Sequence, residues 1–76
     1  MSGKTLNDKT LELVAERFRL LGDPVRLRLL HALGEGERSV ADLVADTGVA
    51  QASASKHLQL LLRGGLVRRR RQGMYV

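Results

Sequence analysis

The sequence predicts a mainly α-helical domain that ends in a small β-hairpin, and three observations support this fold class. Apolar residues recur at helical spacing in four segments, expected at about residues 8–21, 24–33, 39–47 and 50–63. Glycines or an Asp-Pro pair separate these segments, as is typical of helix ends. Near the end of the chain, two short apolar stretches flank an arginine run and a Gln-Gly pair, which predicts a hairpin over residues 66–76.

Length and composition narrow the class of protein. The 76 residues predict a single domain, close to the lower size limit for a self-sustaining core. The absence of cysteine excludes a disulfide framework and thiolate metal sites, and we expect a cytoplasmic protein. No apolar run approaches the roughly 20 residues of a membrane span, so we expect no membrane partner. With one Phe and one Tyr, stacking on bases is not the expected binding mode.

The net charge of +5 is unevenly distributed along the chain. Residues 1–46 contain seven Lys or Arg and eight Asp or Glu, whereas residues 47–76 contain six Lys or Arg and no acidic residue. A cationic half is typical of a surface that faces phosphates. The alternatives are a solvated basic tail and an anionic membrane surface. The membrane alternative is weaker because the basic residues share no helix with a bulky exposed apolar face.

The first helix carries two apolar strips. The first strip has spacing i, i+3, i+7 and i+10 and contains Leu11, Val14, Phe18 and Leu21. Leu13 and Leu20 lie off that face, one heptad apart. This second strip either widens the contact with the domain's own core or forms a dimer seam. For a seam in a homodimer we expect Leu6, Leu13, Arg17 and Leu20.

The second helix begins at an Asp-Pro pair. Asp23 is the expected cap, and Pro24 occupies the first helical position, where its missing N–H is not needed. The residues expected to face inward are Val25, Leu29, Leu30 and Leu33. Arg26 and Arg28 are expected to point away.

Residues 39–63 predict two helices joined by a tight turn. Ser39 can cap the first helix, with Asp42 returning a bond to the Ser39 amide, and Gly48 ends that helix. The following helix places apolar residues on one face and mostly polar ones on the other: Gln51, Ser53, Lys56, Gln59 and Arg63. A small polar face with a cation, just after a glycine turn, is typical of a helix that enters the major groove. We therefore interpret this stretch as a helix-turn-helix.

The arginine run in the hairpin is a candidate phosphate-binding element. Side chains alternate along a strand, so either Arg68 and Arg70 or Arg69 and Arg71 can face one DNA surface. The alternative is a solubilising run that protects an exposed sheet edge. Beside a helix-turn-helix we favour phosphate binding, which supplies affinity and little sequence information.

Three linked phrases resemble the ArsR-type (ArsR/SmtB) winged helix-turn-helix repressors. They are Leu-Gly-Asp-Pro-x-Arg-Leu from Leu21, Ser-x-x-Lys-His-Leu from Ser53, and Gly-Leu-Val-x-x-Arg-x-x-Gly from Gly65. The resemblance implies a dimeric bacterial or archaeal repressor that releases DNA when a signal arrives. It also implies that Gln51, Ser53, Ser55 and Lys56 read the groove, with Gln59 on the same helix, while the wing arginines hold the flanking backbone.

This chain departs from the family pattern at its sensor positions. Metal-sensing members carry a Cys-x-Cys pair where this chain has Ser39 and Ala41, so that site cannot exist. Other members bind metal on a last helix beyond the wing, and this chain stops before it. We therefore expect either a sensor in residues beyond Val76 or a signal other than a metal. Ala50 replaces a usual capping serine, at a cost of about 1 kcal/mol.

The histidines and serines do not indicate a metal or catalytic site. His31 and His57 lack a cysteine or carboxylate cluster at ligand spacing, so we expect no metal and no cofactor. His57 is expected to be a half-buried packing residue. Ser53, Ser55 and His57 lie on one helix without an orienting acid, so we expect no enzyme. The predicted function is sequence-specific duplex-DNA binding by a dimeric repressor with an unknown inducer. The alternative is a winged-helix module for protein–protein contact without specific DNA readout.

Overall fold

The computed structural model describes residues 7–71 and 73–76 and confirms the predicted fold class. The helices in this part of the chain are α1 (Asp8–Leu21), α2 (Pro24–Leu33), α3 (Val40–Thr47) and α4 (Gln51–Arg63). Strands β1 (Arg68–Arg70) and β2 (Gly73–Tyr75) pair antiparallel as the wing. Leu66 and Val67, expected to start the first strand, instead lead into it and pack on the core. No helix among the described residues is long and apolar enough to span a bilayer.

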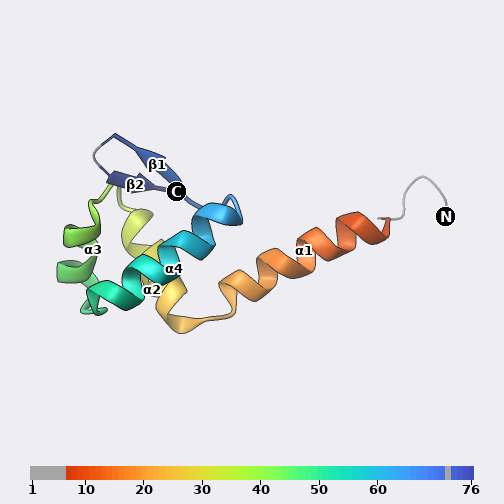
Figure 1. The fold of residues 1–76 in the computed structure, drawn as a ribbon, viewed down its shortest axis with the longest axis horizontal. Helices are drawn as coiled ribbons and strands as arrows, with labels where there is room; N and C mark the ends of the chain where they lie inside the picture. The colour runs from red at the N-terminus through yellow and green to blue at the C-terminus, as the bar shows by residue number, and fades with distance from the viewer. Residues whose placement is uncertain (1–6, 72) are drawn as a thin grey trace.

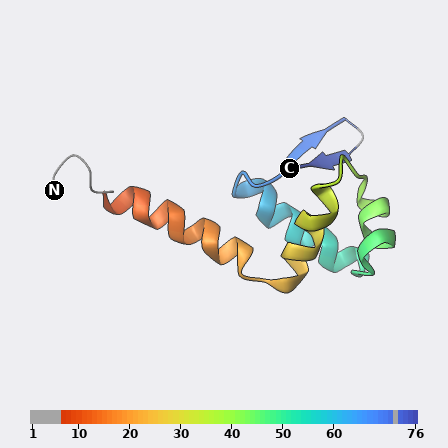
Figure 2. The same cartoon turned by 180° about the vertical axis from the view of Figure 1, so that it is seen from behind.

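Helices α2, α3 and α4 form the body of the molecule, with the wing at one side of it (Figure 1). Helix α1 extends away from this body as an arm, which the reverse view also shows (Figure 2). The arm accounts for the elongated outline of 49 × 23 × 18 Å. The body therefore holds the helix-turn-helix and the wing together, while most of α1 lies outside it.

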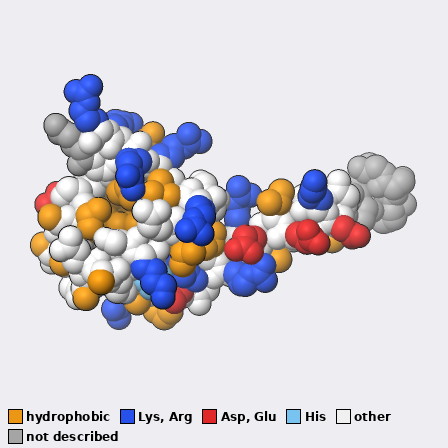
Figure 3. Space-filling model, in the orientation of Figure 1, with side chains coloured by type: hydrophobic (Ala, Val, Ile, Leu, Met, Phe, Trp, Pro, Cys, Tyr) orange, Lys and Arg blue, Asp and Glu red, His pale blue; other side chains and the backbone are white. Residues whose placement is uncertain are grey.

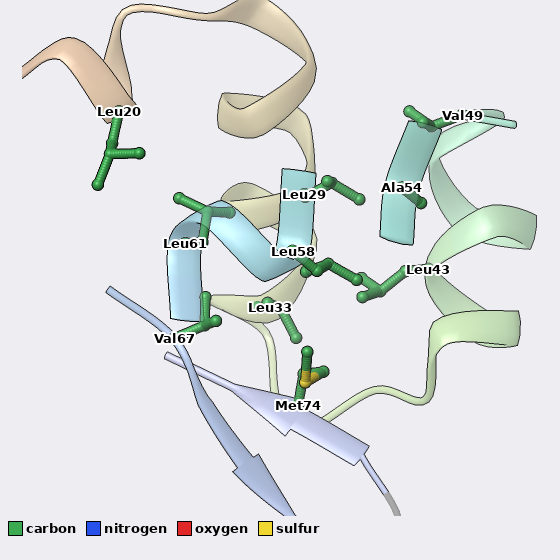
Figure 4. Close-up of a cluster of buried hydrophobic side chains, with 10 residues drawn as sticks. All are labelled: Leu20, Leu29, Leu33, Leu43, Val49, Ala54, Leu58, Leu61, Val67 and Met74. Carbon is green, nitrogen blue, oxygen red and sulfur yellow. The ribbon is translucent and has the colours of Figure 1, made fainter. Parts of the chain in front are cut away.

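The core joins the four helices, β2 and the residue before β1 through buried apolar side chains (Figure 4). Its members are Leu20, Leu29, Leu33, Leu43, Val49, Ala54, Leu58, Leu61, Val67 and Met74. Of the four inward positions predicted on α2, Leu29 and Leu33 are buried in the core, and Val25 and Leu30 are partly buried against it. The core thus fixes α4 against α2, α3 and the wing.

The two apolar strips of α1 do not take their expected places. Leu20, predicted as part of the dimer seam, is only 7% exposed and belongs to the core. The prediction was wrong because the C-terminal end of α1 lies on α4, where Leu20 occupies the space left by the missing side chain of Gly64. The strip expected to face the core is mostly exposed instead, with Leu11 at 48% and Phe18 at 70%. Leu13 and Arg17 are also exposed, and Leu6 lies outside the described residues.

Side-chain caps define the starts of three helices. The carboxylate of Asp23 accepts hydrogen bonds from the amides of Val25 (2.8 Å) and Arg26 (3.2 Å). The Arg26 amide contributes most to lowering the pKa of Asp23 below its ordinary value. Ser39 accepts from the Asp42 amide, but no return bond from Asp42 to the Ser39 amide forms within the described chain. Asn7 caps α1 in the same way.

A third backbone segment joins the wing, which the sequence did not predict. Arg38, just before α3, exchanges both backbone hydrogen bonds with Met74 of β2, at 3.0 and 2.8 Å. The neighbouring Gly73 is essential for this close approach, because a Cβ at that position would lie 2.8 Å from the Arg38 carbonyl oxygen. The wing is therefore attached to the body by backbone pairing as well as by Val67 and Met74.

Replacing Gly73 with alanine should loosen the wing. The new methyl group meets backbone that cannot move without breaking the Arg38–Met74 pairing, so we expect a loss of about 1–3 kcal/mol. Urea unfolding measures this loss, and trypsin should cut the wing arginines faster. Gly22→Ala is the control, because its Cβ would make contacts of 3.4 Å or longer. Equal unfolding midpoints for the two variants would contradict this account.

Candidate nucleic-acid interface

Helix α4 presents one exposed face to solvent. Ala54, Leu58 and Leu61 bury the opposite face in the core, which fixes the rotation of the helix about its axis. The exposed residues are Gln51, Ala52, Ser55, Lys56, Gln59 and Arg63. Four of the five residues expected to read DNA from this helix therefore share that face. The sequence interpretation left Ala52 and Arg63 out of the site, although Arg63 follows Gln59 by four residues.

Ser53 lies apart from this face. Its side chain is half-buried, and at spacing i, i+4 it shares the flank of α4 that carries His57. The hydroxyl of Ser53 therefore lies at the border of the exposed face, and the structure does not group it with Lys56 and Gln59.

The electrostatic character of this face follows from the chain's charge distribution. Lys56 and Arg63 lie on it, and no acidic residue occurs anywhere after Asp46. Lys and Arg side chains gather over the wing and across the face that carries α4, while most acidic side chains visible in this view lie along the arm (Figure 3). The surface around α4 is therefore cationic and suited to a polyanion.

The turn before α4 is held by its own side chains. The Thr47 hydroxyl donates to the Leu43 carbonyl at 2.6 Å and accepts from the Val49 amide at 3.2 Å. Gly48 adopts φ +75°, a left-handed conformation that residues with a Cβ rarely adopt. Ala50 supplies no side-chain cap, as expected from the sequence. The first amides of α4 therefore lack a side-chain acceptor, and such amides bind phosphate oxygens readily.

The register of the wing separates its arginines into two groups. Arg69 pairs with the buried Met74, so the Arg69 side chain lies on the face of the hairpin that is directed toward the body. There Arg69 lines a small hollow of about 70 Å³ together with Ser55 and Gln59 of α4. Arg68 lies opposite Tyr75 and shares the other face with Arg70. Of the two predicted pairs, the one containing Arg69 therefore has a member beside the exposed face of α4, whereas Arg71 lies beyond β1 in the turn of the hairpin, where strand alternation does not place its side chain.

Arg70 is engaged with neighbouring side chains. Its guanidinium lies 4.3 Å from the centre of the Tyr75 ring and 3.4 Å from a Glu37 carboxylate oxygen. The Tyr75 side chain, and then the charge of Glu37, raise the pKa of Arg70 above its ordinary value. These contacts hold Arg70 against the body. Glu37 and Arg70 are too far apart in sequence for spacing to have indicated their pairing.

The remaining candidate residues lie on separate elements. His57 is half-buried and packs beside Arg26, whereas His31 is exposed on α2 at a shallow hollow of about 440 Å³ between α2 and α3. Among residues 7–71 and 73–76, no three His, Cys, Asp or Glu side chains lie close enough together to hold a metal ion.

The sequence of this chain is similar to those of known helix-turn-helix proteins. Residues 21–70 match the profile of a helix-turn-helix domain family. The chain is 44% identical over 59 residues to a probable mercury resistance operon repressor from Streptomyces lividans, covering 78% of this chain and 47% of that protein. It is 43% identical over 63 residues to a transcriptional repressor SmtB homolog from Synechocystis, and the match covers 83% of this chain and 48% of that protein. The chain thus spans about half the length of these relatives.

Solved structures show the same fold. The homodimeric winged helix-turn-helix DNA-binding domain of Mb0332 from Mycobacterium bovis, a possible ArsR-family regulator, superposes with a TM-score of 0.82. The two are 35% identical, and the match covers 100% of this chain and 75% of that one. The repressor BigR from Xylella fastidiosa superposes with a TM-score of 0.73 at 38% identity, and the match covers 90% of this chain and 72% of that one. This chain belongs to the ArsR/SmtB family of helix-turn-helix transcriptional regulators.

Proposed function

We propose that this chain is a sequence-specific duplex-DNA-binding module of a transcriptional repressor, and that residues 1–76 form a single domain. The observation that carries the proposal is the continuous cationic surface formed by the exposed face of α4 and the Arg69 side of the wing. A helix with one buried face and one polar, cationic face fits the major groove, and a hairpin beside it reaches the flanking backbone. For a bacterial or archaeal regulator this activity belongs in the cytoplasm.

Within this surface the residues take different roles. Lys56 and Gln59 lie in the middle of the exposed face and are assigned to base edges, with Gln51 and Ser55 beside them. Arg69 and Arg71 are assigned to phosphates, and Arg68 remains a candidate for the same role. Arg70 is assigned to holding the wing, because its guanidinium already contacts Glu37 and Tyr75.

The active form is assigned as a homodimer that pairs the exposed strips of two α1 arms. Leu11, Val14 and Phe18 recur on one face and are 48%, 39% and 70% exposed. Such a face is self-complementary across a twofold axis, as an isologous interface requires. The homodimeric Mb0332 domain, which superposes on the whole length of this chain, supports a homodimer. Pairing places two α4 helices on half-sites about one helical turn apart.

A salt titration tests the function against its alternative, a module for protein contact. If a dimer neutralises about 6–10 phosphates, affinity for duplex DNA should fall about a thousandfold or more between roughly 50 and 200 mM salt. Fluorescence anisotropy with a duplex selected from a random library measures this slope. Weak binding with a flat salt dependence would favour the protein-contact module.

Lys56→Ala and Arg69→Ala should have different effects on DNA binding. Loss of a base contact from Lys56 should reduce the preference for the selected duplex over random DNA by about 1–3 kcal/mol. Loss of a phosphate contact from Arg69 should weaken binding to both duplexes alike and reduce the salt slope by about one. Arg70→Ala serves as the comparison and should change the slope less, because its charge is partly neutralised by Glu37. Equal losses on both duplexes for Lys56→Ala would remove Lys56 from the reading face.

A further inference from the structure

Arg26 of α2 contacts both the arm and α4, although the sequence predicted that it would point away. Its Nε donates to the Leu20 carbonyl at 2.7 Å, and Nη2 donates to the Arg19 carbonyl at 3.2 Å. Its Nη1 lies 3.3 Å from Nδ1 of His57 on α4. One guanidinium therefore links three helices, and the planar fork of arginine is suited to such divergent contacts.

The accepting carbonyls belong to the last turn of α1. The Arg19 carbonyl also accepts from the Gly22 amide at 3.1 Å, whereas the Leu20 carbonyl has no helical amide to accept from, because Pro24 lies four residues on. A cation at the C-terminal end of α1 also interacts favourably with the negative end of the helix dipole. The side chain of Leu20 also contacts the end of α4: it lies near Leu61 (Figure 4) and against Gly64. The joint between arm and body therefore includes the apolar contact of Leu20 and the guanidinium of Arg26.

A small rotation at this joint has a large effect at the other end of the arm. The 14 residues of α1 make a rod of about 21 Å, so a rotation of about 10° displaces its far end by about 4 Å. This displacement is close to the rise of one base pair. If two arms form the dimer seam, the angle at the joint sets the distance between the two α4 helices.

We propose that Arg26 and His57 are positioning residues that set the half-site spacing the dimer recognises. The proposal rests on the DNA-binding dimer described above. Arginine can only donate, so the contact requires a lone pair on His57 Nδ1 and places the imidazole hydrogen on Nε2. His57 lies on the half-buried flank of α4, away from the exposed reading face. It therefore acts on spacing through the orientation of α4 relative to α1.

Two variants of His57 separate positioning from packing. His57→Asn keeps an acceptor close to the Nδ1 position, whereas His57→Leu keeps the bulk and removes the acceptor. Arg26→Lys is the partner variant, because an ammonium group on a single stem cannot reach all three acceptors in this fork geometry. Urea unfolding of each variant checks that the body remains folded.

The probes are duplexes built from the selected operator. One series changes the separation of the half-sites one base pair at a time, and one duplex carries a single half-site. The wild type and His57→Asn should prefer one separation over its neighbours by about tenfold, the scale of one hydrogen bond to a charged group. His57→Leu and Arg26→Lys should lose most of that preference while binding the single half-site as the wild type does.

Specific binding by the wild type together with an unchanged spacing profile in His57→Leu and Arg26→Lys would overturn this inference alone. Equal losses on the single half-site and the full operator would also overturn it, because His57 would then act on reading or on the folding of α4. If Arg26→Lys unfolds, the comparison of His57→Asn with His57→Leu decides. A wild type that prefers no duplex overturns the proposed function itself, and this inference with it.

Discussion

Val14→Glu combined with Phe18→Glu should abolish the dimer and weaken binding to the full operator by about a hundredfold or more, because the second half-site no longer adds to the first. Both side chains are exposed in the monomer, at 39% and 70%. Glutamate is a good helix former, so α1 should stay folded. Two facing carboxylates from each protomer cannot be buried in an apolar seam without a large desolvation cost. Sedimentation velocity measures the dimer, and fluorescence anisotropy measures operator binding.

The wild-type dimer itself should be weak. A seam made from one helix of each protomer buries less than the roughly 1,600 Å² of a standard interface, so dissociation at micromolar concentrations is expected.

Lys9→Glu is the matched control for the double change of Val14 and Phe18, since it changes the net charge by the same amount outside the strip. Leu13→Glu tests the neighbouring face, where the sequence placed the seam. A dimer that survives the double change and is lost with Leu13→Glu would place the seam there.

Leu58→Ala should lower the free energy of unfolding by about 2–5 kcal/mol. Leu58 is only 1% exposed and lies among the side chains that join α4 to α3 and α2 (Figure 4). A domain of 76 residues is expected to have a total stability of about 4–11 kcal/mol. The variant should therefore be partly unfolded at 37 °C and bind DNA poorly for that reason. Chemical denaturation followed by far-UV circular dichroism measures the loss.

The neighbouring residue provides the opposite result. Gln59 is exposed, so Gln59→Ala should change stability by less than about 0.5 kcal/mol. It should still reduce the preference for the operator, because Gln59 lies in the middle of the reading face and beside Arg69. Similar unfolding midpoints for Leu58→Ala and Gln59→Ala would show that α4 is not held in the way the core indicates.

The boundaries of the helices and the character of α4 could be predicted from the sequence. Caps such as Asp23 and Ser39, and a terminator such as Gly48, act on backbone groups within a few residues. Such interactions are complete within a short segment, so they can be read without the rest of the chain. The polar face of α4 follows in the same way from a period of 3.6 residues, which separates Lys56 and Gln59 from Leu58 and Leu61.

Only the tertiary structure determined which side chains are buried and which segments lie side by side. Both strips of α1 have helical spacing, and only the packing of its last turn against Gly64 assigns Leu20 to the core. The direction of Arg26 depends on carbonyls of another helix, and the pairing of Arg38 with Met74 joins segments 36 residues apart in the chain. Likewise, a period of two allowed either arginine pair to face DNA until the register placed Arg69 beside α4. These contacts are non-local, and their partners become neighbours only when the core assembles.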